Sequence, residues 1–244
     1  MIDVLRGTRE AEWRAWSALG ALPAPDWPED APMIVVAPHP DDEILALGGT
    51  LQLAAAAGHP LSFIAVTDGE ASHPDSTAVT PEALRVLRRE EARLARSRLG
   101  IASPPVRHLG LADGAVAAGH DRLVDAILSV TGRSTVVLAP WRADGHPDHE
   151  AAGRAAAEAV RQAGASLVEY PVWTWNWARP GDERVPWHRA RATHLPAAVR
   201  RAKISAIGAF RSQITALGPD PADGPVLPSA ELAHHRRGFE VVFA

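Results

Sequence analysis

The stretch Val35-Val36-Ala37-Pro38-His39-Pro40-Asp41-Asp42-Glu43 joins an apolar run to a cluster of one imidazole and three carboxylates. The run at 33–37 is apolar and rich in β-branched side chains, which is typical of a buried strand. After the cluster, Ile44, Leu47 and Leu51 recur at helical spacing. The cluster therefore lies where a strand gives way to a helix. In an open α/β sheet this is the carboxyl edge, where ligand sites form.

Part of this cluster has a simple alternative explanation. A helix N-terminus favours carboxylates through its free N–H groups and its dipole, so Asp42 or Glu43 could act only as a cap. Capping does not account for His39 between two prolines, or for the second aspartate. Because His and carboxylate side chains together are common metal ligands, we favour a metal or catalytic site.

A second cluster, His146-Pro147-Asp148-His149-Glu150, repeats this chemistry about a hundred residues later. It follows another strand-like run at 135–139 and precedes an alanine-rich helical stretch at 151–163. Two such strand ends can face each other at one edge of a parallel sheet, which would bring together His39, Asp42 and His149. Two imidazoles and one carboxylate suit catalytic zinc, but they also match the ligand set of non-haem iron, so the residues leave the metal open.

The rest of the chain predicts the architecture around these clusters. Further strands are expected at 61–67, 106–109, 167–173 and 190–194, with helices between them, and residues 240–243 are expected to add an edge strand. This alternation predicts an α/β fold with a Rossmann-like, doubly wound, mostly parallel sheet and helices on both faces. We expect a single domain: an N-terminal helix and proline-rich link at 1–32, a core at 33–177 and a C-terminal extension at 178–244.

Several helical faces can be proposed from spacing. Residues 8–22 place Trp13, Trp16 and Leu19 on one face of a helix. The helix at 80–99 has a helix-starting Thr-Pro-Glu sequence, and its inner face is expected to carry three leucines, with most of its arginines in solvent. A later helix at 197–210 is expected to expose its basic residues. The residues concerned are Leu84, Leu87 and Leu94 on the inner face, and Arg200, Arg201 and Lys203 in solvent.

The tryptophans and the remaining histidines are less decisive. Residues 173–177 alternate so that an extended segment would place three indoles on one face, which could pack in the core or line a substrate cleft. The loop after the second strand, around His73, is expected to be a mobile polar loop that could serve as a lid. The other histidines lack nearby carboxylates in the sequence and are expected to be ordinary surface or packed residues. These residues are Trp173, Trp175 and Trp177, and His188, His194, His234 and His235.

Composition limits the possible partners and location. The 244 residues carry a net charge of −4, so there is no basic footprint for nucleic acid or an anionic membrane. No run approaches the roughly 18 apolar residues of a membrane span. The chain has no cysteine, which excludes disulfides and fits a reducing cytoplasm. Homo-oligomerisation is left open.

The two clusters are similar to those of the PIG-L (LmbE-like) family of zinc-dependent N-deacetylases, and the similarity extends from about 33 to 177. Shorter agreements lie at 67–70, at Arg88 and Glu91, at 110–114 and at 170–173. The resemblance implies one Zn²⁺ per chain, with His39, Asp42 and His149 as its ligands. The implied catalytic residues are Asp41, His146 and Asp148. Arg88, Asp113 and Trp141 are expected near the substrate, and Trp141 is proposed only from its position shortly before His146.

The resemblance also implies a mechanism. Asp41 would act as the general base for a zinc-activated water that attacks an N-acyl group, most simply N-acetyl, of an amino sugar or glycoconjugate. His146, if protonated, would meet the oxyanion, and Asp148 would keep its imidazole oriented and cationic. Either Asp41 or His146 would protonate the departing amine.

Other functions remain open at this level. An amidase acting on thiol conjugates is the nearest alternative within the family. A metal-dependent phosphoesterase would need more carboxylates for two metals, and an iron oxygenase with this motif would be an all-β barrel. A metal- or glycan-binding module is the non-enzymatic alternative. The sequence does not identify the sugar, its aglycone or the acyl group.

Overall fold

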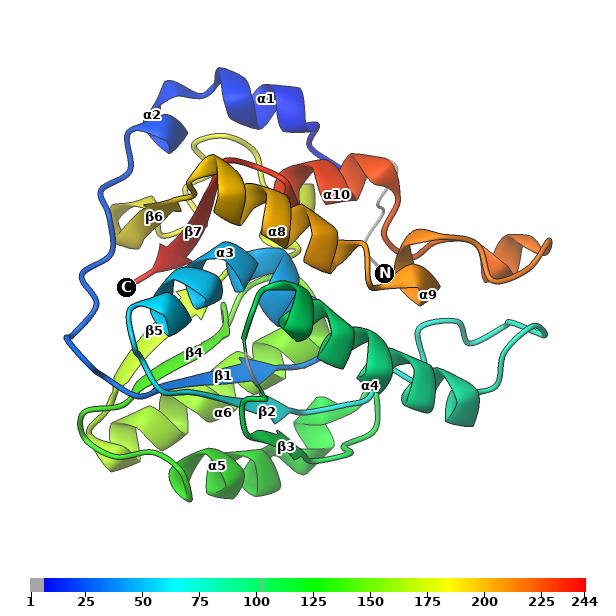
Figure 1. Cartoon of the computed structure of the whole chain (residues 1–244), viewed down its shortest axis with the longest axis horizontal. Helices are drawn as coiled ribbons and strands as arrows, with labels where there is room; N and C mark the ends of the chain where they lie inside the picture. Colours follow the sequence, from blue (N-terminus) through cyan, green and yellow to red (C-terminus); the bar gives the residue numbers. More distant parts are fainter. Residues whose placement is uncertain (1–6, 102) are drawn as a thin grey trace.

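The computed structural model of this chain describes residues 7–101 and 103–244. Within them, the chain forms a seven-stranded sheet in the order β3-β2-β1-β4-β5-β7-β6 (Figure 1). The strands are β1 (Met33–Ala37), β2 (Leu61–Ala65), β3 (Val106–His108), β4 (Val136–Pro140), β5 (Ser166–Tyr170), β6 (Ala190–His194) and β7 (Phe239–Phe243).

The first five strands are parallel, and β1 lies between β2 and β4. Chain order therefore runs outward in one direction from β1 through β2 to β3, and in the other direction from β4 to β5. The boundary between β1 and β4 is the point where a doubly wound sheet changes direction and where ligands usually bind. The doubly wound, mostly parallel fold is confirmed, and the two polar clusters follow the two strands at this boundary.

Helices cover both faces of the sheet (Figure 1). The larger ones on one face are α3 (Asp42–Ala56), α4 (Pro81–Arg98) and α8 (Ala197–Ile207), and those on the other are α5 (His120–Leu128) and α6 (Pro147–Ala163). The shorter ones are α1 (Glu10–Ala15), α2 (Ser17–Gly20), α7 (Thr174–Trp177), α9 (Arg211–Ile214) and α10 (Ser229–His235), with 3-10 turns η1 (Val116–Gly119), η2 (Trp187–Arg189) and η3 (Pro221–Asp223).

Strand β1 is buried along its whole length because both of its faces are covered. Val35 packs into the cluster beneath α3 and α4, whereas Ile34 and Val36 pack into the cluster beneath α5 and α6. Successive side chains of a strand point to opposite faces, so a strand between two helical layers must be apolar throughout. This packing fixes the position of the polar residues that follow it.

The C-terminal extension continues the sheet with two antiparallel strands, and here two predictions are wrong. Strand β7 lies between β5 and β6 rather than at the edge, because its alternate side chains enter two different core clusters. Lys203 on α8 is buried rather than exposed, with its Nζ 2.7 Å from Glu240 Oε1 on β7. Helix α8 packs against α3 and α4, so the ammonium group needs this internal carboxylate.

The expected N-terminal helix is two short helices. Helices α1 and α2 are separated at Trp16, whose backbone is extended, with φ −84° and ψ 102°. The break allows Trp13 and Leu19 to enter one core cluster together with Trp175. A single straight helix over 8–22 is therefore wrong.

Helix α4 turns a different face inward from the one expected. Leu84 is buried, but Leu87 and Leu94 are 39% and 36% exposed. The inner face instead contains charged residues with partners: Arg88 binds Asp41, Glu91 accepts from Ser212, and Arg96 binds Glu43. Paired charges can occupy a buried face, so leucine spacing alone predicts the wrong buried face for this helix.

Two of the late histidines have carboxylate partners that are distant in sequence or on the same helix. His234 Nδ1 lies 2.9 Å from Glu10 Oε2, and His235 Nε2 lies 3.7 Å from Glu231 Oε1, with both imidazoles buried. They are packed residues, as expected, but the expectation that they lack partner carboxylates is wrong. No helix within the described part of the chain is long and apolar enough to cross a bilayer.

Candidate active site

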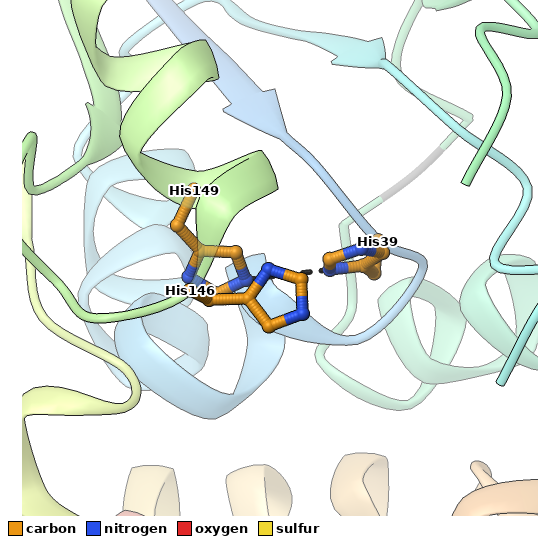
Figure 2. A group of neighbouring side chains, drawn as sticks. All are labelled: His39, His146 and His149. Atoms are coloured by element: carbon orange, nitrogen blue, oxygen red, sulfur yellow. Dashed lines mark hydrogen bonds between the residues drawn. The ribbon is translucent and has the colours of Figure 1, made fainter. Parts of the chain in front are cut away.

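The two sequence clusters meet at the carboxyl ends of β1 and β4. His39 lies in the turn from β1 into α3, and Asp42 is the first residue of α3; His146 immediately precedes α6, and His149 lies in its first turn. Figure 2 shows the imidazoles of His39, His146 and His149 turned toward one another. His146 is the N-cap of α6, and its Nδ1 accepts from the backbone N–H of Asp148 at 3.2 Å.

Three donor atoms form a nearly equilateral triangle. His39 Nδ1 lies 3.2 Å from Asp42 Oδ2, and His149 Nε2 lies 3.2 Å from the same oxygen. The two ring nitrogens are 3.3 Å apart. A tetrahedral zinc site with bonds of about 2.0–2.1 Å places its donor atoms about 3.3 Å apart. The proposed ligand set therefore fits a single Zn²⁺ ion.

His146 offers an alternative third imidazole. Ring nitrogens of His39, His146 and His149 lie within 4.8 Å of one another. The triangle that contains Asp42 has all three donor atoms 3.2–3.3 Å apart, the spacing of a tetrahedral shell, and it combines two imidazoles with one carboxylate. We therefore treat His146 as a neighbour of the metal position rather than a ligand.

Both imidazoles of the triangle are held from behind by carboxylates. The outer nitrogen of His39, Nε2, lies 3.2 Å from Asp113 Oδ1 and 3.3 Å from Asp148 Oδ2. The outer nitrogen of His149, Nδ1, lies 2.8 Å from Asp144 Oδ2. Such carboxylates fix the tautomer and orientation of metal-binding histidines. Sequence analysis missed Asp144; the only available signal was its place between the strand end and the second cluster.

The electrostatics of the site follow from these contacts. Burial lowers the pKa of both histidines, but neighbouring carboxylates outweigh it: Asp113, Asp148 and Asp42 raise the pKa of His39 well above its usual value, and Asp42 and Asp144 raise that of His149 to about 9. Burial raises the pKa of Asp42, but His149 and His39 together hold it well below its usual value.

Asp41 has a different partner from its neighbour Asp42. Its Oδ2 accepts from Arg88 Nη2 at 3.0 Å, and only 5% of the residue is exposed. Burial raises the pKa of Asp41, and the charge of Arg88 opposes that rise. A buried carboxylate with a raised pKa, beside the proposed ligands, suits a general base.

Arg88 contacts the chain itself. Only 3% of Arg88 is exposed, and Nη1 donates to the carbonyl of Gly69 at 2.9 Å while Nη2 binds Asp41. Gly69 has φ +67°, and a Cβ there would lie 1.9 Å from Nη1, so glycine is required for this approach. The structure therefore makes Arg88 a partner of Asp41 rather than an open substrate contact.

The relationship between His146 and Asp148 differs from the expectation. The Asp148 oxygens accept from the backbone N–H groups of Gly114 at 2.7 Å and Val116 at 3.1 Å, and Oδ2 lies beside His39. Burial, with His149 and His39 nearby, lowers the pKa of His146 to about 4. Asp148 thus holds His39 rather than His146, and the lowered pKa of His146 favours its neutral form at pH 7. Because His146 Nδ1 accepts from the backbone N–H of Asp148, the neutral ring carries its hydrogen on Nε2 and remains a hydrogen-bond donor.

The aromatic expectations are mostly corrected. Residues 174–177 form α7 rather than an extended segment. Trp175 is buried against Trp13, and Trp141, only 6% exposed, packs near Trp177 and Phe243 in the core. Trp173 is partly exposed and lies nearly parallel to the His146 ring, with 6.5 Å between centroids. Trp173, rather than Trp141, is therefore the indole beside the site.

The loop between β2 and α4 is tied to neighbouring segments. Ala71 N–H donates to Asp113 Oδ2 at 2.9 Å, and His73 Nε2 lies 3.2 Å from the carbonyl of Gly224. Ser76 Oγ donates to Asp223. His73 is thus held by the C-terminal extension and is separate from the proposed ligands, in agreement with its interpretation as a loop residue.

Comparison with known proteins gives consistent results. A curated relative from Bacillus cereus, described as a probable N-acetyl-alpha-D-glucosaminyl L-malate deacetylase 2, is 28% identical over 207 residues, covering 77% of this chain and 86% of its own. The solved N,N'-diacetylchitobiose deacetylase from Pyrococcus horikoshii superposes with a TM-score of 0.58 at 20% identity, covering 78% of this chain and 72% of its own.

The fold is also shared by a protein with different chemistry. The 4-carboxy-2-hydroxymuconate hydratase from Pseudomonas putida superposes with a TM-score of 0.53 at 22% identity, covering 75% of this chain and 80% of its own. At such identities the likeness establishes the fold alone. The family model described as PIG-L, GlcNAc-PI de-N-acetylase, matches residues 34–160, which is more than half of the chain and includes both polar clusters. This chain belongs to the PIG-L family.

Proposed function

We propose that this protein is a zinc-dependent N-deacetylase that removes an acetyl group from an amino sugar or glycoconjugate. The observation that carries the proposal is the triangle of His39 Nδ1, Asp42 Oδ2 and His149 Nε2, at 3.2–3.3 Å spacing, with the buried Asp41 carboxylate beside it. Family membership and the named activity of the Bacillus relative support an N-acetylglucosamine conjugate as substrate.

The three ligands would hold one Zn²⁺ ion per chain, which when bound supplies an acidified water and polarises the acyl carbonyl. Asp41 takes the proton from the attacking water, and Arg88 holds the Asp41 carboxylate in place. The Nε2–H group of His146 donates a hydrogen bond to the oxygen that becomes negative in the transition state. The carbon–nitrogen bond then breaks, and the amine leaves with the proton that Asp41 took from the water, because a neutral His146 could give up its hydrogen only by becoming an imidazolate. The products are acetate and a free amine.

We propose that neighbouring groups exclude water and align the substrate. The indole of Trp173 lies beside His146 and nearly parallel to its ring, where it would border the bound sugar. Asp113, which holds His39, is linked through Ala71 to the loop after β2, so this loop lies beside the metal position. We include Asp113 and this loop among the groups that would contact the sugar, and we propose a cytoplasmic location, which the cysteine-free composition suits.

The decisive experiment is a substrate panel with zinc-loaded protein. N-acetylglucosamine linked to malate, to inositol and to a second N-acetylglucosamine would be incubated with enzyme, and both free amine and acetate would be measured. We expect equal amounts of the two products from at least one conjugate, and none with Asp41→Asn. Release of phosphate from phosphosugars, hydrolysis of acylated thiol conjugates alone, or addition of water to a carbon–carbon double bond without amine release would each replace the proposal.

A further inference from the structure

Asp144 is a completely buried carboxylate just beyond the end of β4, and the mechanism above does not use it. We propose that Asp144 is a positioning residue that holds His149 in the only tautomer able to bind a cation through Nε2. The proposal rests on the metal site of the proposed function. The role of Asp144 is inferred from the hydrogen bonds that its carboxylate accepts.

Five groups contact the Asp144 carboxylate, and four of them are N–H or O–H groups that donate to it; the fifth is the His149 imidazole. Oδ1 accepts from the backbone N–H groups of Val172 at 3.0 Å and Thr174 at 2.9 Å, and from the Thr174 hydroxyl. Oδ2 accepts from the N–H of Trp173 at 2.9 Å and faces His149 Nδ1 at 2.8 Å. A carboxylate that only accepts requires the hydrogen of His149 to be on Nδ1.

This hydrogen position decides which nitrogen can bind a metal. With a hydrogen on Nδ1, the neutral imidazole has its free lone pair on Nε2. Nε2 is the atom that lies 3.2 Å from Asp42 Oδ2 and 3.3 Å from His39 Nδ1. Asp144 therefore prepares His149 for the metal position without touching that position.

The surrounding backbone fixes the position of Asp144 beside His149. Gly145 has φ +92°, and a Cβ on it would lie 2.7 Å from the Trp177 ring. The Trp177 indole N–H donates to the Asp144 carbonyl at 2.7 Å. Side chain and main chain of Asp144 thus bind the start and end of α7, which also fixes the neighbouring Trp173. The metal ligand and the indole beside it share one support.

Replacement by asparagine reverses one half of this pattern. An amide keeps an oxygen for Val172 and Thr174, but its NH₂ group then faces the Trp173 N–H and His149 Nδ1. To accept from that NH₂ group, His149 would have to move its hydrogen to Nε2, where it blocks metal binding. Flipping the amide only moves the conflict to the other three donors. Loss of such a support typically weakens metal binding 10–100-fold.

The test compares zinc affinities of wild type and Asp144→Asn by competition with a chromophoric chelator, on protein whose folding has been checked by thermal melting. We expect the affinity to fall 10–100-fold. Thr174→Val is the matched control because it removes one donor to Asp144 and leaves the His149 contact intact; its affinity should stay within about twofold of wild type. Equal affinity in Asp144→Asn and wild type, or an equal loss in both variants, would overturn the proposal.

A measurement on the wild type keeps the proposal testable if Asp144→Asn does not fold. In the zinc-loaded protein labelled with ¹⁵N in histidine, His149 should show a protonated Nδ1 and a metal-bound Nε2. Metal on Nδ1, or an unprotonated Nδ1, would refute the role of Asp144. These readouts do not require turnover, so zinc binding with the predicted tautomer but no amine release would reject the proposed reaction and leave the role of Asp144 standing.

Discussion

The guanidinium of Arg88 donates to Asp41 across 3.0 Å, and both side chains are almost completely buried. This contact links the proposed base to the loop after β2, because the same guanidinium also binds the Gly69 carbonyl. Through this contact the charge of Arg88 stabilises the ionised form of Asp41. Burial raises the pKa of Asp41, and the positive charge of Arg88 keeps that rise in check.

Removing this charge should shift the pH dependence of catalysis. In Arg88→Met the pKa of Asp41 rises further, so the base is protonated at a higher pH, and the acidic limb of kcat/KM should move upward by about one pH unit or more. Activity should fall more at pH 6 than at pH 8, and Arg88→Lys should recover part of the loss at pH 6. An acidic limb that does not move in Arg88→Met would show that Arg88 acts otherwise.

The adjacent aspartates should separate into a ligand and a base. Asp42→Ala and His149→Ala should lose both zinc and activity, whereas Asp41→Asn should retain zinc and lose at least about 10²-fold in kcat. Metal content by elemental analysis and kcat on the same preparations would test this. If Asp41→Asn empties the site and Asp42→Ala keeps it filled, the two roles are reversed.

His146 should act as a neutral donor. His146→Ala should retain zinc and lose on the order of 10²-fold in kcat, the scale of losing one transition-state hydrogen bond. Because burial and the neighbouring His149 and His39 lower the pKa of His146 to about 4, its protonation state should not change between pH 6.5 and 8.5. A fall in kcat over that range that disappears in His146→Gln would show instead that the imidazolium is the active form.

Zinc binding should release protons. The raised pKa values of His39 and His149 favour cationic rings at pH 7 before zinc binds, and each ring must lose one proton to bind zinc. Asp42 is already ionised and releases none. Affinity should therefore rise by up to about 100-fold per pH unit between pH 6 and 8.

Calorimetry in buffers of different ionisation enthalpy would count these protons directly. We expect a value close to two at pH 7, and a lower value as the pH approaches 9, where His149 titrates. Proton release near zero at pH 7 would mean that the histidines are already neutral, and the electrostatic account of the site would be wrong. More than one tightly bound zinc per chain would contradict the single-ion site.

The parts of this site that could be predicted are those encoded next to strand ends. His39, Asp42 and His149 could be predicted because each follows shortly after an apolar strand. Neighbouring parallel strands bring such positions together at one edge of the sheet. Asp144 was missed because its partners at 149 and 172–174 are assembled only by the fold. No local pattern distinguishes such a residue from a loop aspartate.

The errors in packing have a common physical cause. Leucine spacing on α4 suggested an apolar inner face, but Arg88 and Arg96 are inside because Asp41 and Glu43 neutralise them there. Lys203 is likewise buried because Glu240 lies opposite. Hydrophobic periodicity treats every charge as exposed, so it fails where a tertiary partner compensates a buried charge.

The N-terminal segment offers a test of stability that is independent of the active site. Glu10 on α1 accepts from Arg237 and contacts His234 Nδ1 at 2.9 Å, which fastens α1 to α10 and the start of β7. Burial raises the pKa of Glu10, but His234 and Arg237 outweigh it and lower the pKa from about 4.5 to about 2. A carboxylate with a depressed folded-state pKa stabilises the fold above its unfolded-state pKa, and this contribution is lost as the pH falls from about 4.5 toward 2.

Glu10→Gln should therefore reduce the free energy of unfolding at pH 7 by about 1–3 kcal/mol, and its difference from wild type should shrink as the pH falls below 4.5. Urea unfolding at pH 7, 5 and 3.5 would measure both effects, with Glu90→Gln as the control because its ion pair with Arg93 is solvent-exposed. A difference between wild type and Glu10→Gln that stays constant across this range would show that Glu10 stabilises the fold by packing rather than by its charge.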